Sequence, residues 1–130
     1  MAIDRTVIDA PGAPPAVGPY SHAVRCGNLL FCSMQIPLDP ESGEVKGDTP
    51  AEQITVCLQN LTAIAQAGGG SLDDAARLTV YIIDMSAFAD VNEAYAKFFG
   101  ADPPARAAIG VTALPRGVEV AVDAVIALPA

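Results

Sequence analysis

Apolar residues recur along this chain at two spacings, which separate predicted helices from predicted strands. Residues 50–67 carry apolar side chains three and four positions apart, the spacing of one buried helix face. Thr49 offers an N-cap hydroxyl, Glu52 can complete a capping box, and Gly68 ends the helix. Ser86 is expected to cap a second helix that runs up to Gly100. Its apolar face is formed by Phe88, Val91, Tyr95, Phe98 and Phe99.

Strands are predicted where β-branched and other apolar residues form short runs. The runs lie at about residues 22–26, 29–33, 76–83, 105–112 and 118–128. Gly27-Asn28 has the chemistry of a hairpin turn, and Leu114-Pro115-Arg116-Gly117 that of a tight turn between the last two strands. The order β-β-α-β-α-β-β shows no linker or repeat. It predicts one α+β domain over residues 1–130, with two helices packed on one face of a sheet.

The last predicted strand is apolar on both of its faces. Its outward positions, which include Ala121, Asp123 and Val125, are too apolar for open solvent. Apolar residues make up 52% of the chain and charged residues only 17%, so a monomer would expose much apolar surface. Packing of subunits into a closed ring is therefore expected.

Charge and hydropathy exclude several classes of partner. The formal net charge is -8 and the seven basic residues are scattered, whereas phosphate binding needs clustered Lys and Arg. We therefore expect no nucleic-acid partner. No apolar run reaches the roughly 18 residues that cross a bilayer, and the N-terminal segment lacks an apolar signal core. A cytoplasmic protein without a membrane partner is expected.

The cysteines and the single histidine favour structural roles. Cys26, Cys32 and Cys57 are odd in number and lack C-x-x-C spacing, so we expect reduced core residues rather than disulfides or a zinc site. His22 lies in a predicted strand, where a satisfied hydrogen bond is favoured over catalysis. The carboxylates show no ligand spacing, so no metal is expected.

Two charges stand inside otherwise apolar strands, Arg106 and Asp123. If residues 105–128 form a hairpin, Ala108 opposes Asp123 and Arg106 opposes Val125. Arg106 and Asp123 would then be diagonal neighbours on one face. A buried ion pair would explain them and is the more frequent case. Alternatively, the guanidinium binds a substrate carboxylate while Asp123 orients water.

Four short segments, spread in order over about residues 7–127, match one known pattern. They are Gly18-Pro19-Tyr20-Ser21; Ser33-Met34-Gln35-Ile36-Pro37 with Asp39-Pro40; Asp84, Phe88, Val91-Asn92 and Tyr95 to Phe99; and Pro104-Ala105-Arg106 with Leu114-Pro115. Together they resemble the reactive intermediate deaminase family, RidA/YjgF. The resemblance implies a chorismate-mutase-like α+β fold and a homotrimer with three clefts between subunits. It also implies hydrolysis of 2-enamine and 2-imino acids to 2-keto acids and ammonia, without metal or organic cofactor.

The same resemblance assigns roles to individual residues. Arg106 would bind the substrate carboxylate, and Asp123 would assist the attacking water. Tyr20 and Ser33 would line the cleft, and Asn92 would contribute less directly.

Three positions of this site vary or depart from the family pattern. Met34 replaces a glycine, which crowds or reshapes the cleft, while Ala108 fits the alanine form of a position that also holds cysteine. Asp123 replaces a glutamate, so its carboxylate is drawn back from the water position by more than about 1 Å, a displacement that can cost about 100-fold in rate.

Three other functions remain open on the sequence alone. The first is a trimeric binding module for small carboxylates such as 2-keto acids, without turnover. The second is a deaminase for another intermediate, of the aminomuconate or aminoacrylate-peracid type. The third is a structural trimer in which Arg106 and Asp123 are merely paired.

Overall fold

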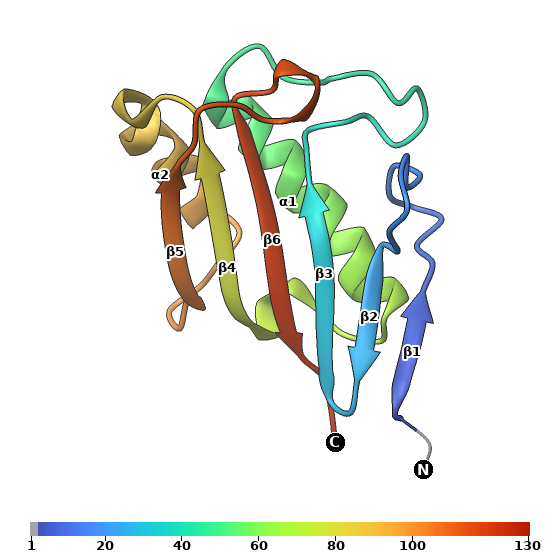
Figure 1. The fold of residues 1–130 in the computed structure, drawn as a ribbon. Coiled ribbons are helices and arrows are strands. Elements are labelled where there is room, and N and C mark those ends of the chain that lie inside the picture. The colour runs from blue at the N-terminus through green and yellow to red at the C-terminus, as the bar shows by residue number, and fades with distance from the viewer. Residues whose placement is uncertain (1–2) are drawn as a thin grey trace.

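A six-stranded mixed sheet backed by two helices forms the body of the molecule, as a computed structural model of residues 3–130 shows (Figure 1). The elements in chain order are β1 (Arg5–Ile8), β2 (Ala23–Cys26), β3 (Leu29–Gln35), α1 (Pro50–Ala67), β4 (Ala75–Ile82), α2 (Phe88–Ala96), β5 (Ala105–Gly110) and β6 (Val120–Ala127). Both helices lie behind the sheet in the view of Figure 1. The predicted α+β architecture with two helices on one face is confirmed.

The first helix begins and ends where the sequence predicts. The Thr49 side chain accepts a hydrogen bond from the Glu52 N–H, and the Glu52 carboxylate accepts one from the Thr49 N–H, so the capping box is complete. The predicted cap of the second helix is wrong. Asp84 caps a short 3-10 turn at Met85–Ala87 instead, and α2 ends at Ala96, before Gly100.

The strand order differs from the prediction in one decisive respect. The sheet runs β1-β2-β3-β6-β4-β5, so β6 lies between β3 and β4 and is antiparallel to both. β5 is parallel to β4 and does not pair with β6, so the predicted hairpin is wrong. The cause is the helix between β4 and β5, because a strand, a crossover helix and a second strand pair in parallel. β1, a four-residue edge strand, was not predicted.

This order separates Arg106 from Asp123. Leu78 of β4 is in register with Arg106, while the next residue, Thr79, is in register with Asp123. Paired residues point to the same face, and successive residues point to opposite faces. Arg106 therefore lies on the face that the helices cover, and Asp123 on the other face, with β4 between their strands. The predicted diagonal contact is wrong.

The core lies between the helices and one face of the sheet. Fully buried side chains meet there from β3, β4, β6 and α1, and they include Leu30, Leu78, Val122, Leu58 and Leu61.

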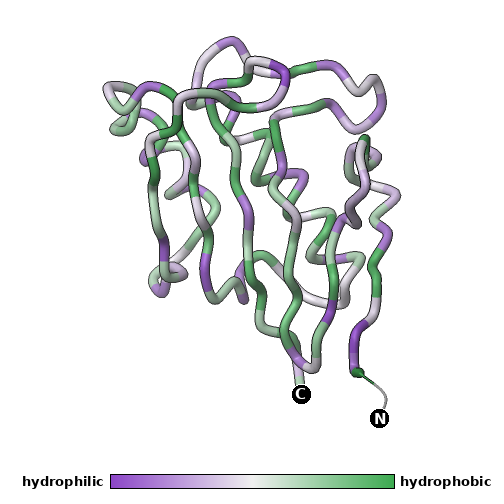
Figure 2. The backbone as a smooth tube through the Cα atoms, viewed as in Figure 1, coloured by the Kyte–Doolittle hydropathy of each residue, from purple (hydrophilic) through white to green (hydrophobic). Residues whose placement is uncertain are grey.

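Several strands are green along much of their length in Figure 2, so they are rich in apolar residues. On the sheet face that both helices leave open, some of these apolar side chains are exposed. Phe31 is 45% exposed, Ile109 44% and Val7 54%. A face of this kind is suited to contact with further protein.

The cysteines divide between core and surface. Cys32 and Cys57 are buried, as predicted, but Cys26 is exposed, and all three are free. No helix in the described part of the chain is long and apolar enough to cross a membrane.

Candidate functional site

Arg106 projects from the edge strand β5 towards α2. Its Nη1 donates a hydrogen bond of 2.6 Å to Oδ1 of Asn92. Within residues 3–130, no carboxylate oxygen lies within 4.0 Å of its guanidinium, and Nε and Nη2 make no hydrogen bond. The Arg106–Asp123 ion pair considered from the sequence is therefore absent from the described chain. The guanidinium keeps one full donor edge free for an anion.

The surroundings of Arg106 come from one face of α2. Phe88, Asn92 and Tyr95 stand four and three residues apart, so they project from the same side of the helix. The Cζ atom of Arg106 lies 5.5 Å from the centre of the Phe88 ring and 4.8 Å from that of Tyr95. A cavity of about 440 Å³ opens beside the guanidinium, lined by Asn92, Tyr95, Ala96, Phe99, Gly100, Pro103, Pro104 and Arg106.

Ala108, the other predicted residue of β5, lies two positions beyond Arg106 and so points to the same face. It is in register with Val80 and is half-buried. Its methyl group packs against the apolar core, where it adds no polar contact.

Asp123 lies on the uncovered face of β6. Its Oδ2 accepts a hydrogen bond of 2.8 Å from the Tyr81 hydroxyl, which comes from β4. This hydrogen bond is the main reason that the pKa of Tyr81 is raised, and burial adds to it. One carboxylate oxygen of Asp123 is thus fixed, while Oδ1 has no partner among the hydrogen bonds of the described residues.

Ser33 and Met34 form an irregularity of β3 opposite Asp123. Cys32 pairs with Ala124 and Gln35 pairs with Val122, so two residues of β3 face the single residue Asp123. This is the pattern of a β-bulge, which often occurs beside active sites.

Neighbouring contacts fix this bulge. The Ser33 hydroxyl donates to the Ser21 carbonyl at 2.6 Å, and the Ser33 N–H donates to the His22 carbonyl at 2.9 Å. These two bonds fasten the bulge to the segment that carries Tyr20.

A second cavity, of about 340 Å³, opens over the bulge. Its walls are Val17, Tyr20, Ser33, Met34, Ile36 and Pro115. Tyr20 is 46% exposed, and its hydroxyl oxygen accepts a long hydrogen bond from the Val17 N–H at 3.4 Å. Three of the predicted residues, Tyr20, Ser33 and Met34, therefore share this cavity.

The predicted residues thus form two groups within one chain. Arg106 and Asn92 lie together at the β5 edge, with Ala108 nearby, and Tyr20, Ser33, Met34 and Asp123 lie around the β3 bulge. β5 and β3 are three strand spacings apart, about 14 Å at a spacing of about 4.8 Å. A small substrate held by Arg106 therefore does not reach the second group of its own chain.

The sequence did not point to Phe88 and Tyr95 as neighbours of Arg106. The available signal was their helical spacing around Asn92, which puts all three on one face once Asn92 is taken as a site residue.

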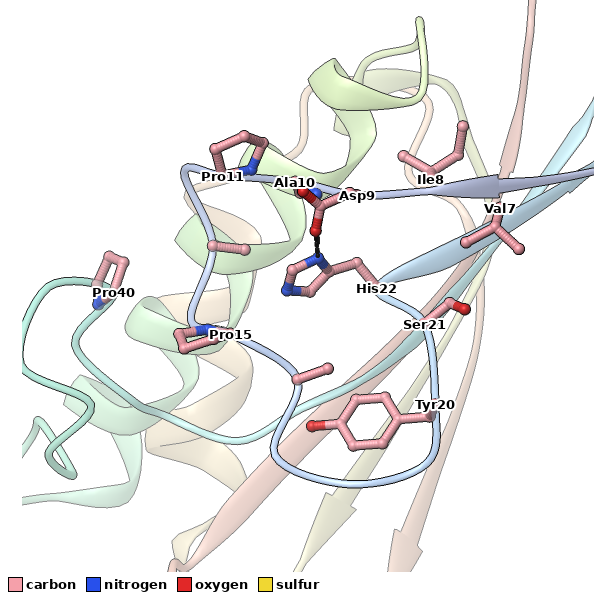
Figure 3. A pocket seen from close by; sticks show the side chains of 12 residues that line it. Val7, Ile8, Asp9, Ala10, Pro11, Pro15, Tyr20, Ser21, His22 and Pro40 are labelled. Carbon is pink, nitrogen blue, oxygen red and sulfur yellow. Dashed lines mark hydrogen bonds and ion pairs between the residues drawn. The ribbon is translucent and has the colours of Figure 1, made fainter.

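His22 lies in a third cavity, of about 640 Å³, which Figure 3 shows from close by. Its Nδ1 accepts from the Ala10 N–H at 3.0 Å and lies 3.3 Å from Oδ1 of Asp9. Its Nε2 lies 2.7 Å from the Pro14 carbonyl, so the neutral ring donates there. Both nitrogens bond to the loop backbone, so the predicted satisfied hydrogen bonding of His22 is confirmed, although His22 lies just before β2 and not within it.

The two buried cysteines, Cys32 and Cys57, are poor nucleophiles, and residues 3–130 show no metal centre. Burial raises the pKa of the Cys32 thiol to about 12, so it stays protonated at neutral pH. Within the same residues, no three His, Cys, Asp or Glu side chains gather as metal ligands would. Arg106 thus offers a cation, and Asp123 offers a carboxylate oxygen that has no hydrogen-bond partner among the described residues.

Known proteins are similar to this chain over most of its length. Residues 10–128 match the family model described as endoribonuclease L-PSP. A mouse 2-iminobutanoate/2-iminopropanoate deaminase is 40% identical over 124 residues, which cover 95% of this chain and 92% of the mouse protein. A RutC family protein of Sinorhizobium fredii is 48% identical, over 89% of this chain and 92% of its own length.

Solved structures show the same fold. The crystal structure of RidA from an Antarctic Psychrobacter species aligns with a TM-score of 0.91 at 37% identity, covering 95% of this chain and 99% of that one. The structure of Escherichia coli TdcF with bound serine aligns with a TM-score of 0.90 at 35% identity, with the same coverage. The motifs, the fold and these relatives agree, and the chain belongs to the RidA/YjgF family.

Proposed function

We propose that this protein hydrolyses 2-imino acids and their enamine tautomers, releasing ammonia and a 2-keto acid. The observation that carries this proposal is the free edge of the Arg106 guanidinium, exposed beside a cavity and held by Asn92. Such an edge suits a carboxylate bound through two parallel hydrogen bonds. The mouse relative named for 2-iminobutanoate and 2-iminopropanoate supports substrates of this class.

The proposed site is completed by a second copy of the chain. Arg106 and Asp123 lie on opposite faces of one sheet, so one copy does not present both to a small substrate. The uncovered apolar face, with Phe31 and Ile109 on it, favours self-association, because a second copy would remove this surface from water. A closed ring of three copies would place Arg106 of one copy against Tyr20, Ser33, Met34 and Asp123 of the next.

The reaction needs little from the protein beyond position and charge. The Nε and Nη2 groups of Arg106 bind the carboxylate and fix the imine carbon. The free Oδ1 of Asp123 accepts a hydrogen bond from water, which adds to that carbon and gives a carbinolamine. Transfer of a proton to nitrogen lets ammonia leave and the 2-keto acid form. Positioning of this kind requires no covalent nucleophile.

The family description as an endoribonuclease receives little support from the charge of this chain. The net charge of -8 repels phosphates, and binding of RNA relies on clustered basic residues. Arg106, a single exposed cation, suits one carboxylate better than the many phosphates of RNA.

The test generates 2-iminopropanoate in place from alanine and an amino-acid oxidase and follows release of pyruvate. Wild type is expected to accelerate release, and Arg106→Ala to lose nearly all of that acceleration. Arg25→Ala is the matched control, since Arg25 is an exposed arginine whose side chain donates to the Gly27 carbonyl and to no other group within residues 3–130. If wild type binds pyruvate through Arg106 but does not speed hydrolysis, the protein is a binding module and the enzyme proposal fails.

A further inference from the structure

The guanidinium of Arg106 lies against two aromatic rings of α2. Its Cζ atom is 4.8 Å from the centre of the Tyr95 ring and 5.5 Å from that of Phe88. Both distances fall within the roughly 6 Å at which a cation over a ring face is attracted to the ring. Asn92 lies between these two residues on the same helix face and binds Nη1. All three residues therefore interact with the guanidinium from one face of α2.

The rings themselves are held in place. Tyr95 is 5% exposed, and its ring packs on that of Phe99 at 4.8 Å between centres with a tilt of 40°. Phe88 is half-buried. A long arginine side chain has many rotamers, whereas these rings have few. The α2 face is thus a rigid support for a flexible cation.

The Tyr95 hydroxyl takes no part in this support. It is buried and has no hydrogen-bond partner among the described residues. The feature of Tyr95 that Arg106 uses is therefore the ring face, and phenylalanine would supply the same face. Tyr95→Phe therefore removes the hydroxyl and keeps the ring, so it separates the contributions of the two groups.

We propose that Tyr95 and Phe88 are positioning residues that hold the Arg106 guanidinium in the plane where its free edge meets the substrate carboxylate. With Nη1 bound to Asn92 and the plane set by the two rings, Nε and Nη2 point together at the ligand. The side chain is ordered before the ligand arrives, so less entropy is lost on binding. This inference rests on the proposed carboxylate binding by Arg106.

The test compares Tyr95→Leu, Tyr95→Phe and Phe88→Leu with wild type. The dissociation constant of 2-oxobutanoate is measured by calorimetry, and KM and kcat are measured with 2-iminobutanoate generated in place. Loss of one ring is expected to weaken binding and raise KM about fivefold, close to 1 kcal/mol. The kcat is expected to change less than twofold, because the bound geometry still forms once substrate is present. Tyr95→Phe is expected to bind 2-oxobutanoate as tightly as wild type.

Val91→Ala is the control for a merely structural effect. Val91 lies on α2 and is 1% exposed in the core, so its truncation destabilises the helix packing without touching Arg106. Thermal unfolding ranks the variants by stability. If Val91→Ala weakens binding as much as Tyr95→Leu at a similar loss of stability, the positioning role is overturned. Should Tyr95→Leu fail to fold, the half-buried Phe88→Leu carries the comparison.

The failure of this inference is separable from failure of the proposed function. If the leucine variants bind 2-oxobutanoate as tightly as wild type, the rings do not position Arg106, although hydrolysis can stand. If wild type shows no hydrolysis, binding measurements alone still decide the role of the rings.

Discussion

Mixing two inactive variants tests whether the site is shared between copies of the chain. Arg106→Ala removes the carboxylate ligand, and Asp123→Ala removes the group proposed to hold water. Within one chain these residues lie on opposite faces of the sheet, with β4 between their strands. A site assembled from two copies therefore takes Arg106 from one and Asp123 from its neighbour.

The expected recovery of activity follows from the number of intact sites in a mixed ring. In a ring, each site needs its first copy to keep Arg106 and its second copy to keep Asp123. When the two variants are mixed equally and reassociate at random, each condition holds in about half of the positions. About a quarter of the sites are then intact in a closed ring. The mixture is expected to show about a quarter of wild-type activity, although each variant alone is nearly inactive.

The assay unfolds the two purified variants together, refolds them, and follows pyruvate release from 2-iminopropanoate. Each variant refolded alone is the background, and wild type refolded alone sets the full rate. The double variant Arg106→Ala/Asp123→Ala, mixed with wild type, provides a control that dilutes sites without complementing them. If the mixture is no more active than the separate variants while wild type refolds to full activity, the two residues act within one chain or Asp123 is not needed.

Three further outcomes are expected. Asp123→Glu should raise kcat, by up to about 100-fold if the shorter aspartate side chain misplaces the water, whereas Asp123→Asn should lower kcat. Equal kcat values for wild type and these two variants would show that Asp123 has no part in the mechanism. Thr49→Ala should lower the free energy of unfolding by about 1 kcal/mol, measured with urea, because it removes one half of the capping box; no change would mean that the box does not stabilise α1. The pKa of buried Cys32 is raised from 9.0 to about 12, so the thiol of the unfolded chain ionises at a lower pH than that of the folded chain. The shift therefore contributes its full stability below pH 9, and this contribution is lost as the pH rises from 9 towards 12. Cys32→Ala should therefore unfold with a smaller loss of stability over that pH range than wild type, and an identical pH profile would contradict the assignment.

Local sequence signals predicted the helices and most strands because their causes are local. Thr49 and Glu52 are three residues apart and satisfy each other's backbone groups, so the start of α1 could be inferred from four residues. The short β1 was missed because Arg5–Ile8 has only four residues and gains its partners from β2, far along the chain.

The strand order could not be predicted from the turn alone. Leu114 to Gly117 has the composition of a tight turn, and Arg116 does adopt a positive φ of 59° there. A turn of this composition, however, is compatible both with a hairpin and with a connection that crosses β4 to reach β6. The decisive evidence was the strand-helix-strand order around α2, which favours parallel pairing of β4 and β5.

The sequence pointed to individual candidate residues but not to their arrangement. Asn92 does bind Arg106, and the Ser33–Met34 bulge does face Asp123. The faces on which Arg106 and Asp123 lie depend on a register set by long-range pairing, which the sequence does not state. The family resemblance implies clefts between subunits, and the opposite faces of Arg106 and Asp123 in one copy support a site of that kind.

The most direct measurement of the shared site is a crystal structure with 2-oxobutanoate bound. The account predicts the ligand carboxylate on Nε and Nη2 of Arg106, and its keto carbon beside Asp123 and the Ser33–Met34 bulge of the adjacent copy. A ligand that contacts Arg106 and Asp123 of the same copy, or that lies away from Arg106, would contradict it.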